Sequence, residues 1–235
     1  MIKEAMILAA GFGERLRPLT KDCPKPLLEI GEETLLSNTL RFLKEGGINK
    51  VVINVHYLSE KIIDYLKNNK FDLSINIVQE KKKILDTGGG VLNTIKYFSK
   101  QPFIVINPDT IWNTKYLNSL KKMENFFFDN KKKKCLLLLV NKDKSFDKNL
   151  IGDFSLQNNL VTRKKINSLN YIYTGLQIIN PNIFSKNQEE VFSINKVWDK
   201  LIQREELHGI ESNNDFLHVS TFEIYKKIIE KNFKR

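Results

Sequence analysis

Two glycines and an arginine near the start of the chain are the residues best suited to bind an anion. An apolar run at residues 5–10 leads directly into Gly11, Gly13 and Arg15. Because glycine has no Cβ, backbone N–H groups in such a turn can approach a bound anion closely. Arg15 adds a planar, permanently charged guanidinium group that matches phosphate oxygens. We therefore predict a phosphate-binding loop at this point.

A lysine and an aspartate are expected to act beside that loop. Lys25 stands between two prolines, which restrict its backbone, and a lysine fixed there could stabilise charge that develops on a phosphoryl group. Asp109 follows an apolar run at residues 103–106, and ligands of open α/β sheets bind at the carboxyl ends of the strands. Asp109 could also cap the segment that follows it. In combination with the loop and Lys25, metal binding is the favoured interpretation.

The glycine loop differs from two better-known phosphate loops. A dinucleotide-binding loop needs a third glycine where this chain has Leu16, and a P-loop needs Gly-Lys followed by serine or threonine, which the sequence lacks. The motif Ala-Ala-Gly-x-Gly-x-Arg-Leu-x-Pro-Leu-Thr at residues 9–20, with Pro-Lys-Pro-Leu at 24–27, resembles the nucleotidyltransferases that make nucleoside diphosphate sugars. Over nearly the whole chain the likeness is greatest to compact N-acetylmuramate 1-phosphate uridylyltransferases and to mannose-1-phosphate guanylyltransferases.

The resemblance implies a role for each residue of the expected site. It makes Arg15, Lys25 and Asp109 catalytic, with Asp109 binding Mg²⁺, or Mn²⁺ as the alternative. It implies nucleotide contacts from the glycine loop and from turns after the following strands, namely Leu8, Ala9, Ala10, Gly11, Gly13, Glu80 and Gly88. It implies sugar contacts from Thr87, Gly89, Asn107, Gly152, Asp153, Thr174 and Gly175.

The chain departs from the family's pattern at the second carboxylate of the metal site. The matching stretch is residues 216–222, where His218 replaces the aspartate. Because Mg²⁺ prefers hard oxygen ligands, three alternatives stay open. His218 contacts phosphate or water beside the metal, the metal is a softer ion such as Mn²⁺ or Zn²⁺, or catalysis is weakened. The other histidines, His56 and His208, are expected to be structural or surface residues.

The implied reaction is an in-line attack by a sugar 1-phosphate oxygen on the α-phosphorus of a nucleoside triphosphate, with release of pyrophosphate. Such a transfer needs positioning and charge neutralisation but no nucleophilic side chain. The likeness favours UTP with N-acetylmuramate 1-phosphate, and a mannose-1-phosphate guanylyltransferase is the alternative. A non-catalytic sugar-nucleotide sensor is the hypothesis from another class. His218 prompts that hypothesis, and retention of Arg15, Lys25 and Asp109 argues against it.

Apolar runs that predict buried strands alternate with segments of helical period. Strands are expected at 5–10, 51–55, 73–78, 103–106, 136–140 and 171–179, helices at 60–67, 91–98, 117–127, 195–204 and 221–229, and a hairpin at 153–163. This rhythm predicts an α/β fold, a Rossmann-like and mostly parallel mixed sheet flanked by helices. Residues 1–235 would form a single nucleotidyltransferase domain without a β-helix. In it, 1–140 bind mainly the nucleotide, and 141–235 supply a small β elaboration on the sugar side and the last helices.

The composition argues against a nucleic-acid or membrane protein. The 235 residues carry a net charge of +11, but the lysines are spread along the chain and no nucleic-acid-binding motif accompanies them. No apolar run is long enough to span a bilayer. The two cysteines lack metal-ligand spacing and do not make a disulfide framework. We therefore expect a cytoplasmic monomer or homodimer whose partners are an NTP and a sugar 1-phosphate, with no nucleic acid and no membrane.

Overall fold

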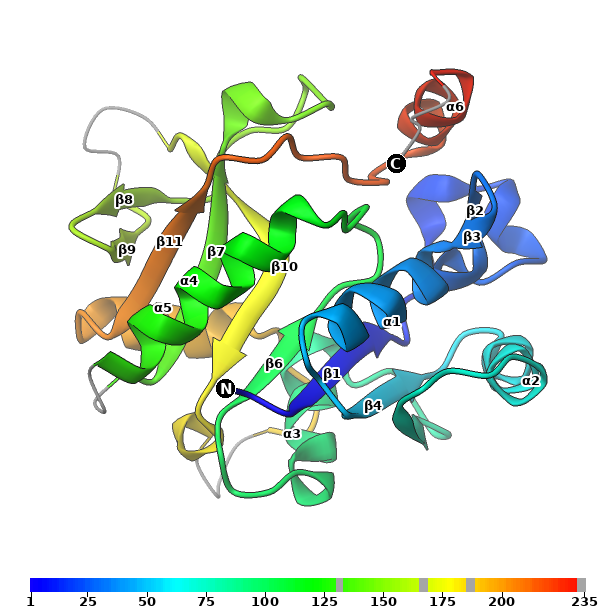
Figure 1. Cartoon of the computed structure of the whole chain (residues 1–235), viewed down its shortest axis with the longest axis horizontal. Coiled ribbons are helices and arrows are strands. Elements are labelled where there is room, and N and C mark those ends of the chain that lie inside the picture. Colours follow the sequence, from blue (N-terminus) through cyan, green and yellow to red (C-terminus); the bar gives the residue numbers. More distant parts are fainter. Residues whose placement is uncertain (130–132, 165–168, 185–188, 232–235) are drawn as a thin grey trace.

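A nine-stranded mixed sheet forms the centre of the computed structural model, which describes residues 1–129, 133–164, 169–184 and 189–231 (Figure 1). Across the sheet the strands are β5 (Ser74–Gln79), β4 (Lys50–Val55), β1 (Glu4–Ala9), β6 (Phe103–Ile106), β10 (Tyr171–Ile179), β7 (Cys135–Asn141), β11 (Leu207–Ser212), β9 (Leu160–Thr162) and β8 (Ser155–Gln157). The first four are parallel, and so are β7 and β11. Strand β10 runs antiparallel to both of its neighbours and joins the two parallel parts.

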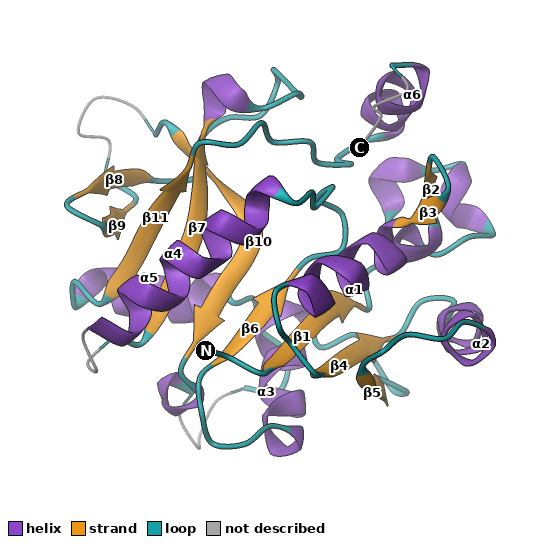
Figure 2. Cartoon of the chain, viewed as in Figure 1, coloured by secondary structure: helices purple, strands orange, loops and turns teal. Residues whose placement is uncertain are grey.

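Helices cover both faces of this sheet (Figure 2). One face packs against α1 (Leu35–Glu45), α2 (Ser59–Asn68) and α4 (Lys115–Asp129). The other packs against α3 (Asp86–Thr94) and α5 (Asn195–Gln203). Helix α6 (Phe222–Glu230) contacts the segment after the glycine loop. Because side chains alternate across a strand, Ile7 of β1 enters the first core and Met6 the second. Among the described residues, no helix is long and apolar enough to cross a membrane.

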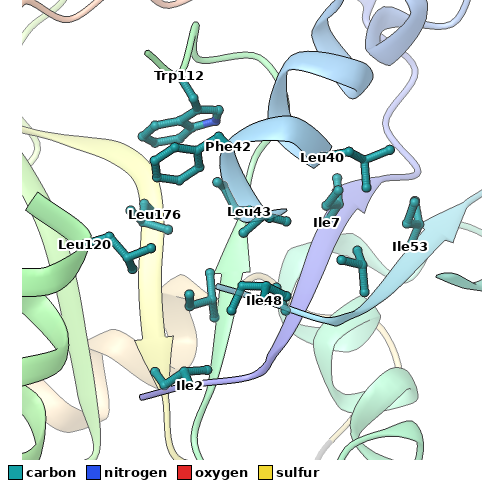
Figure 3. Packing of buried hydrophobic residues seen from close by; sticks show 14 of the residues in the cluster. Ile2, Ile7, Leu40, Phe42, Leu43, Ile48, Ile53, Trp112, Leu120 and Leu176 are labelled. Carbon is teal, nitrogen blue, oxygen red and sulfur yellow. The ribbon is translucent and has the colours of Figure 1, made fainter. Parts of the chain in front are cut away.

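The core between α1, α4 and the sheet holds the loop that follows Asp109. The rings of Phe42 and Trp112 stack with centroids 5.3 Å apart, and both side chains are fully buried (Figure 3). Leu40 and Leu43 of α1 and Leu120 of α4 pack in the same cluster. Burial of one such side chain contributes about 1.5–3 kcal/mol. The loop is therefore fixed by the core rather than by its own local structure.

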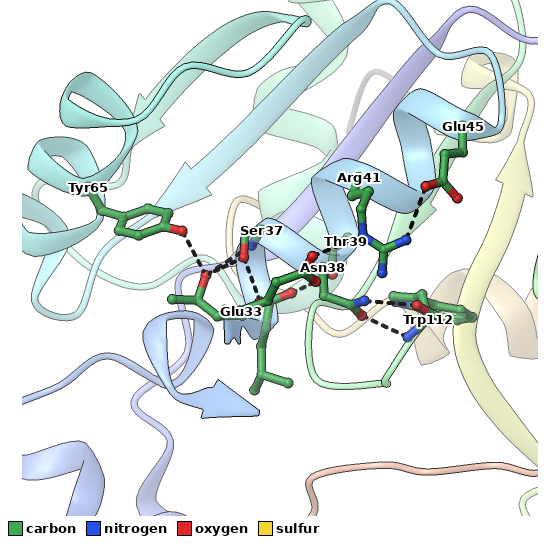
Figure 4. A network of polar contacts seen from close by, with 10 residues as sticks. Glu33, Ser37, Asn38, Thr39, Arg41, Glu45, Tyr65 and Trp112 are labelled. Atoms are coloured by element: carbon green, nitrogen blue, oxygen red, sulfur yellow. Dashed lines mark hydrogen bonds and ion pairs between the residues drawn. The ribbon is translucent and has the colours of Figure 1, made fainter. Parts of the chain in front are cut away.

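Polar contacts from α1 fix the same loop (Figure 4). Thr34 caps the helix, since its hydroxyl oxygen accepts from the backbone N–H of Ser37 at 3.0 Å. One turn later the buried Asn38 donates to the carbonyl of Trp112 at 2.9 Å and accepts from its N–H at 2.8 Å. The Trp112 indole N–H in turn donates to the carbonyl of Asn107 at 3.1 Å. The backbone on both sides of Asp109 is held by these bonds.

The predicted α/β architecture is confirmed, including the small hairpin of β8 and β9. Helix α1, strand β11 and a small antiparallel pair, β2 (Glu29–Ile30) and β3 (Glu33–Thr34), were not predicted. Strand β11 contains His208 and Gly209, which interrupt its apolar pattern, and a Cβ on Gly209 would lie 2.7 Å from Cγ2 of Val161. The helix expected at 91–98 begins earlier, at Asp86, and ends at Thr94.

Candidate active site

The glycine loop begins where β1 ends, and its two glycines have different surroundings. Gly13 has a φ of +67°, and a Cβ there would also lie 3.0 Å from Cγ2 of Thr20. The buried Thr20 hydroxyl donates to the Gly13 carbonyl at 2.8 Å. A Cβ on Gly11, by contrast, would meet no atom within 4 Å. Gly13 is required by the loop itself, whereas Gly11 leaves room on an open side.

That open side is a cavity of about 600 Å³ at the carboxyl ends of β1, β4 and β6. Arg15 is exposed and lines it. Ten of the residues predicted from the sequence line the cavity: Leu8, Ala9, Ala10, Gly11, Gly13, Arg15, Lys25, Thr87, Asn107 and Asp109. The three predicted catalytic residues, Arg15, Lys25 and Asp109, therefore line the same cavity as the loop expected to bind phosphate.

Lys25 and Asp109 form an ion pair at the edge of the cavity. The Lys25 Nζ lies 2.6 Å from Oδ2 of Asp109, and the two side chains are only 14% and 16% exposed. Burial by itself would raise the pKa of Asp109, but the charges of Lys25 and His218 outweigh it and lower that pKa to about 2. Asp109 is therefore ionised at neutral pH.

A short segment, residues 216–220, brings His218 to the same carboxylate. On one side its backbone is bonded to the loop after β6. There the N–H of Ile111 donates to the Leu217 carbonyl at 2.9 Å, and the N–H of Val219 donates to the backbone carbonyl of Asp109 at 2.8 Å. On its other side Phe146 donates to Phe216 at 2.9 Å. Neither Leu217 nor Phe216 belongs to a strand of the main sheet, and isolated bridges at Thr110 and Ser145 complete the arrangement.

Within that segment His218 faces Asp109 at a distance longer than a good hydrogen bond. Its Nδ1 lies 3.5 Å from Oδ1 of Asp109, its ring stacks on Phe216, and neither of the two atoms has a hydrogen-bond partner among the described residues. Burial lowers the pKa of His218, the Asp109 charge acts in the opposite direction, and the cations Lys25 and Arg15 lower the pKa further. The imidazole is therefore disposed to be neutral beside an ionised carboxylate.

The donor set at Asp109 fits a divalent cation that also binds substrate phosphates. The buried Oδ1 atom has no hydrogen bond, so one carboxylate oxygen is available, while Lys25 occupies the other. Mg²⁺ is commonly held by one or two carboxylates together with phosphate oxygens and water. Within the described ranges no three His, Cys, Asp or Glu side chains are grouped to hold a metal by themselves. A metal bound at Asp109 would take its other ligands from substrate phosphates and water.

The predicted nucleotide and sugar residues around α3 lie against protein instead of the cavity, except for Thr87. The N–H groups of Gly88 and Gly89 both donate to the carbonyl of Phe192, at 2.9 and 3.0 Å. Glu80 is buried, and its two carboxylate oxygens accept from Asn54 and Leu85. The structure therefore does not bring Glu80, Gly88 and Gly89 onto the cavity wall.

The remaining predicted sugar residues also lie off the cavity wall. Thr174 is buried and donates to the Leu138 carbonyl at 2.9 Å. Gly175 has a φ of +92°, and a Cβ there would lie 3.0 Å from Cβ of Asn107, so it supports a cavity residue from behind. A Cβ on Gly152 would lie 2.0 Å from the Leu169 carbonyl oxygen, and Asp153 accepts from the Tyr173 N–H at 2.9 Å.

Several cavity residues were missed by sequence reasoning, notably Phe12, Asn54, Asp86 and Ser220. Asn54 carried a usable signal, because it is a polar residue near the end of a buried apolar strand. Asp86 is in the left-handed region with a φ of +60°, which sequence alone does not reveal. His56 and His208 each donate through Nδ1 to a backbone carbonyl, that of Glu80 and that of Glu206 respectively, and neither histidine lines the cavity.

Comparisons with known proteins agree with this geometry. The model of the family described as nucleotidyl transferase matches residues 4–146. The N-acetylmuramate alpha-1-phosphate uridylyltransferase of Neisseria meningitidis is 32% identical over 183 residues, 77% of each chain, and that of Caulobacter vibrioides is 28% identical over 222 residues, 92% of this chain and 91% of the relative. The mannose-1-phosphate guanylyltransferase catalytic subunit beta of Drosophila melanogaster is 27% identical over 88% of this chain and 56% of its own length.

A solved structure shows the same fold over nearly the whole chain. HddC from Yersinia pseudotuberculosis superposes with a TM-score of 0.77 at 25% identity, covering 99% of this chain and all of that one. A second structure of HddC, complexed with GMP-PN, gives a TM-score of 0.78. With a matched family model over more than half of its residues, and with the phosphate loop, lysine and aspartate on one cavity, the chain belongs to the nucleotidyl transferase family.

Proposed function

We propose that this nucleotidyltransferase joins a nucleoside triphosphate to a sugar 1-phosphate, giving a nucleoside diphosphate sugar and pyrophosphate. One observation carries the proposal, namely that Gly11, Arg15, Lys25 and Asp109 line a single cavity of about 600 Å³. A cavity of that size accommodates two small substrates side by side. The cationic side chains and the backbone N–H groups of the loop suit phosphate, and the carboxylate suits the metal that accompanies it.

The chain's own residues would act by positioning and charge neutralisation. Gly11, Gly13 and Arg15 hold the β- and γ-phosphates, so that the pyrophosphate leaves against fixed positive charge. Lys25 binds phosphate oxygens near the reacting phosphorus, and Asp109 keeps the lysine in place until the substrates arrive. The attacking oxygen belongs to the sugar phosphate and is already ionised, so no side chain has to remove a proton from it.

Asp109 would hold the divalent cation, with Mg²⁺ as the first candidate and Mn²⁺ as the alternative. When bound, the cation neutralises phosphate charge and fixes the two phosphate groups relative to each other. The neutral His218 is placed to accept or donate a hydrogen bond beside it. This arrangement supports the first of the three alternatives for His218, a contact with phosphate or water.

For the substrates we propose UTP with N-acetylmuramate 1-phosphate. Support comes from the two relatives named for that reaction, which align with 77% and 92% of this chain. The guanylyltransferase relatives make GTP with mannose 1-phosphate the second candidate. Thr87 and Asn107 are proposed to contact the sugar directly, and Gly175 and Thr174 to support that wall. Gly152 and Asp153 stay proposed sugar-side residues, although they do not line the cavity.

The continuous sheet from β5 to β8 supports treatment of residues 1–235 as one functional domain. The two free cysteines, Cys23 and Cys135, support a reducing, cytoplasmic setting.

Pyrophosphate release, measured with UTP, GTP, CTP and dTTP against a panel of sugar 1-phosphates, tests the proposal. We expect release only when both substrates and Mg²⁺ or Mn²⁺ are present, with the highest kcat/KM for UTP and N-acetylmuramate 1-phosphate. NTP binding without release for any pair and any metal would overturn the transferase proposal and favour a sensor. A preference for GTP and mannose 1-phosphate would overturn the substrate assignment alone.

A further inference from the structure

A buried pair of polar side chains lies beneath the two loops that face each other across the cavity. Asn54 is on β4 and 2% exposed, and Glu80 follows β5 and is 4% exposed. Nδ2 of Asn54 donates to Oε1 of Glu80 at 2.7 Å. Strands β1, β4 and β5 are neighbours in the sheet (Figure 1), so the pair lies where their carboxyl ends meet.

The other atoms of the pair bind the last residue of β1, from which the glycine loop starts, and the residue that precedes α3. Oδ1 of Asn54 accepts from the N–H of Ala9 at 3.1 Å, two residues before Gly11. Oε2 of Glu80 accepts from the N–H of Leu85 at 2.8 Å, directly before the cavity residue Asp86. Three hydrogen bonds in series therefore join the glycine loop to the opposite wall.

A carboxylate at this place is not explained by packing. Glu80 forms no ion pair with any residue the structure describes, and the groups that donate to its carboxylate, the Asn54 amide and the Leu85 N–H, are neutral. Burial of a charge without an opposite charge has a large free-energy cost unless hydrogen bonds offset it. A carboxylate does, however, offer two acceptors in a fixed geometry, which is what two donors from different loops require.

Helix α3 closes the pair from a third side. A Cβ on Gly90 would lie 2.8 Å from Nδ2 of Asn54 and 3.2 Å from Oε1 of Glu80. The Glu80 backbone is fixed as well, because its N–H donates to the Val55 carbonyl at 2.8 Å. The orientation of the Asn54 amide is thereby determined by its surroundings.

We propose that Asn54 and Glu80 are positioning residues for the nucleotide, which set the separation of the glycine loop from the wall at residues 84–87. Glu80 acts through Asn54 and Leu85 and does not accept from the base. The inference rests on the proposed function, because it presumes that an NTP lies between these two walls. Loss of the pair should weaken NTP binding, with little effect on the sugar phosphate, whose proposed contacts at Asn107 are held separately by Trp112 and Gly175.

Single and paired isosteric substitutions test this. In Asn54→Asp the new carboxylate faces the carboxylate of Glu80, so no hydrogen can lie between them. In Glu80→Gln the new NH₂ group faces either the Asn54 amide or the Leu85 N–H, both of which are donors. In the double variant Asn54→Asp/Glu80→Gln every hydrogen bond can be remade. The Ala9 N–H donates to the carboxylate at position 54, and the amide at position 80 donates to the same carboxylate. The Leu85 N–H donates to the amide oxygen at position 80, so only the bond between positions 54 and 80 reverses direction.

We expect each single variant to weaken UTP binding by about tenfold, since a buried polar group is left unpaired. Calorimetric titration measures the Kd, and initial rates separate the KM for NTP from the KM for sugar phosphate and from kcat. The double variant should regain UTP affinity to within about threefold of wild type. Glu4→Gln is the matched control, because Glu4 pairs with Lys50 at the opposite end of β1 and should leave UTP binding unchanged.

Wild-type UTP affinity in both single variants would overturn the inference, and so would a double variant that folds but stays weak. If a single variant fails to fold, two other proteins test the inference. The double variant must keep its UTP affinity. Gly90→Ala, which displaces the pair without changing its hydrogen-bonding groups, must lose UTP affinity. Absence of UTP and GTP binding by the wild type would overturn the proposed function itself, a result distinguishable from these.

Discussion

At Gly11 the glycine loop opens onto the cavity, whereas at Gly88 and Gly89 the turn that begins α3 is filled by another part of the chain. A Cβ on Gly11 would meet nothing within 4 Å. A Cβ on Gly88 would lie 2.3 Å from Cε2 of Phe192, and one on Gly89 would lie 2.2 Å from the carbonyl oxygen of Glu190. The first glycine leaves space for a ligand, and the other two leave space for the protein.

The backbone donors of the two turns differ in the same way. A helix N-terminus can bind an anion through its free N–H groups, but at α3 the Phe192 carbonyl accepts from both Gly88 and Gly89. An internal carbonyl thus stands where a phosphate could have been bound. We infer that anion binding falls to the glycine loop, with Arg15 and Lys25 beside it.

The largest expected effect is on catalysis beside the open loop. Lys25→Met and Asp109→Asn should each reduce the rate of pyrophosphate release by at least about a hundredfold, because each removes a fixed charge close to the reacting phosphorus. Circular dichroism should show an intact fold, and Lys67→Met, on the exposed side of α2, should release pyrophosphate at the wild-type rate. Near-normal turnover in well-folded Lys25→Met or Asp109→Asn would remove those residues from the mechanism.

At the closed turn the expected effect is on stability. Gly89→Ala should lower the free energy of unfolding by about 1–3 kcal/mol or more, because its methyl group meets backbone that must shift. Urea denaturation measures the loss, and Gly11→Ala should stay within about 0.5 kcal/mol of wild type. If Gly89→Ala unfolds like the wild type but binds UTP poorly, the glycine serves the ligand and the contrast between the two turns is wrong.

The ion pair beside the open loop should make stability depend on acidity. The pKa of Asp109 in the folded protein is about 2, below its ordinary value of 3.8. The group therefore contributes stability above pH 3.8, and this contribution, about 2 kcal/mol, is lost as the pH falls toward 2. In metal-free protein the difference in unfolding free energy between wild type and Asp109→Asn should shrink between pH 5 and pH 2. A difference that stays constant over that range would contradict the low pKa.

The smallest expected effect is that of Gly11→Ala on the affinity for UTP. The substitution adds a methyl group to open space, so UTP should bind several-fold more weakly, about one kcal/mol, while the unfolding midpoint stays unchanged. Calorimetric titration of UTP into both proteins measures the change. Unaltered UTP affinity would place the phosphates elsewhere in the cavity and leave Gly11 without a role in binding.

Local patterns were enough to predict the alternation of strands and helices and the glycine loop itself. The runs at 5–10 and 103–106 are apolar enough to identify β1 and β6, and Asp109 follows the latter directly. The roles of Glu80 and of the glycines in the first turn of α3 depend on partners that local sequence does not reveal. Nothing in the local sequence of Gly88 and Gly89 reveals that Phe192 fills the turn.

The same reason explains why strand β11 was missed. Gly209 weakens the pattern of β11 but is required by close packing against Val161. Helix α1 was missed for another reason, because its local signal was not used: Thr34 caps it, and the apolar residues Leu36, Leu40 and Leu43 follow at helical spacing. The ion pair of Lys25 with Asp109 likewise joins residues far apart in the sequence, and no spacing rule predicts it.

The segment at 216–220 has a consequence for folding, because the contact between His218 and Asp109 depends on it. His218 meets Asp109 only after that segment has been inserted between the loop after β6 and the stretch at 144–146. Contacts between distant parts of a chain form slowly, since the intervening loop must close first. The contact between His218 and Asp109 is therefore expected to form late in folding, and Val219 of the same segment also packs with Leu16 beside the glycine loop. Opening of this segment would separate the imidazole from the carboxylate with most of the sheet undisturbed.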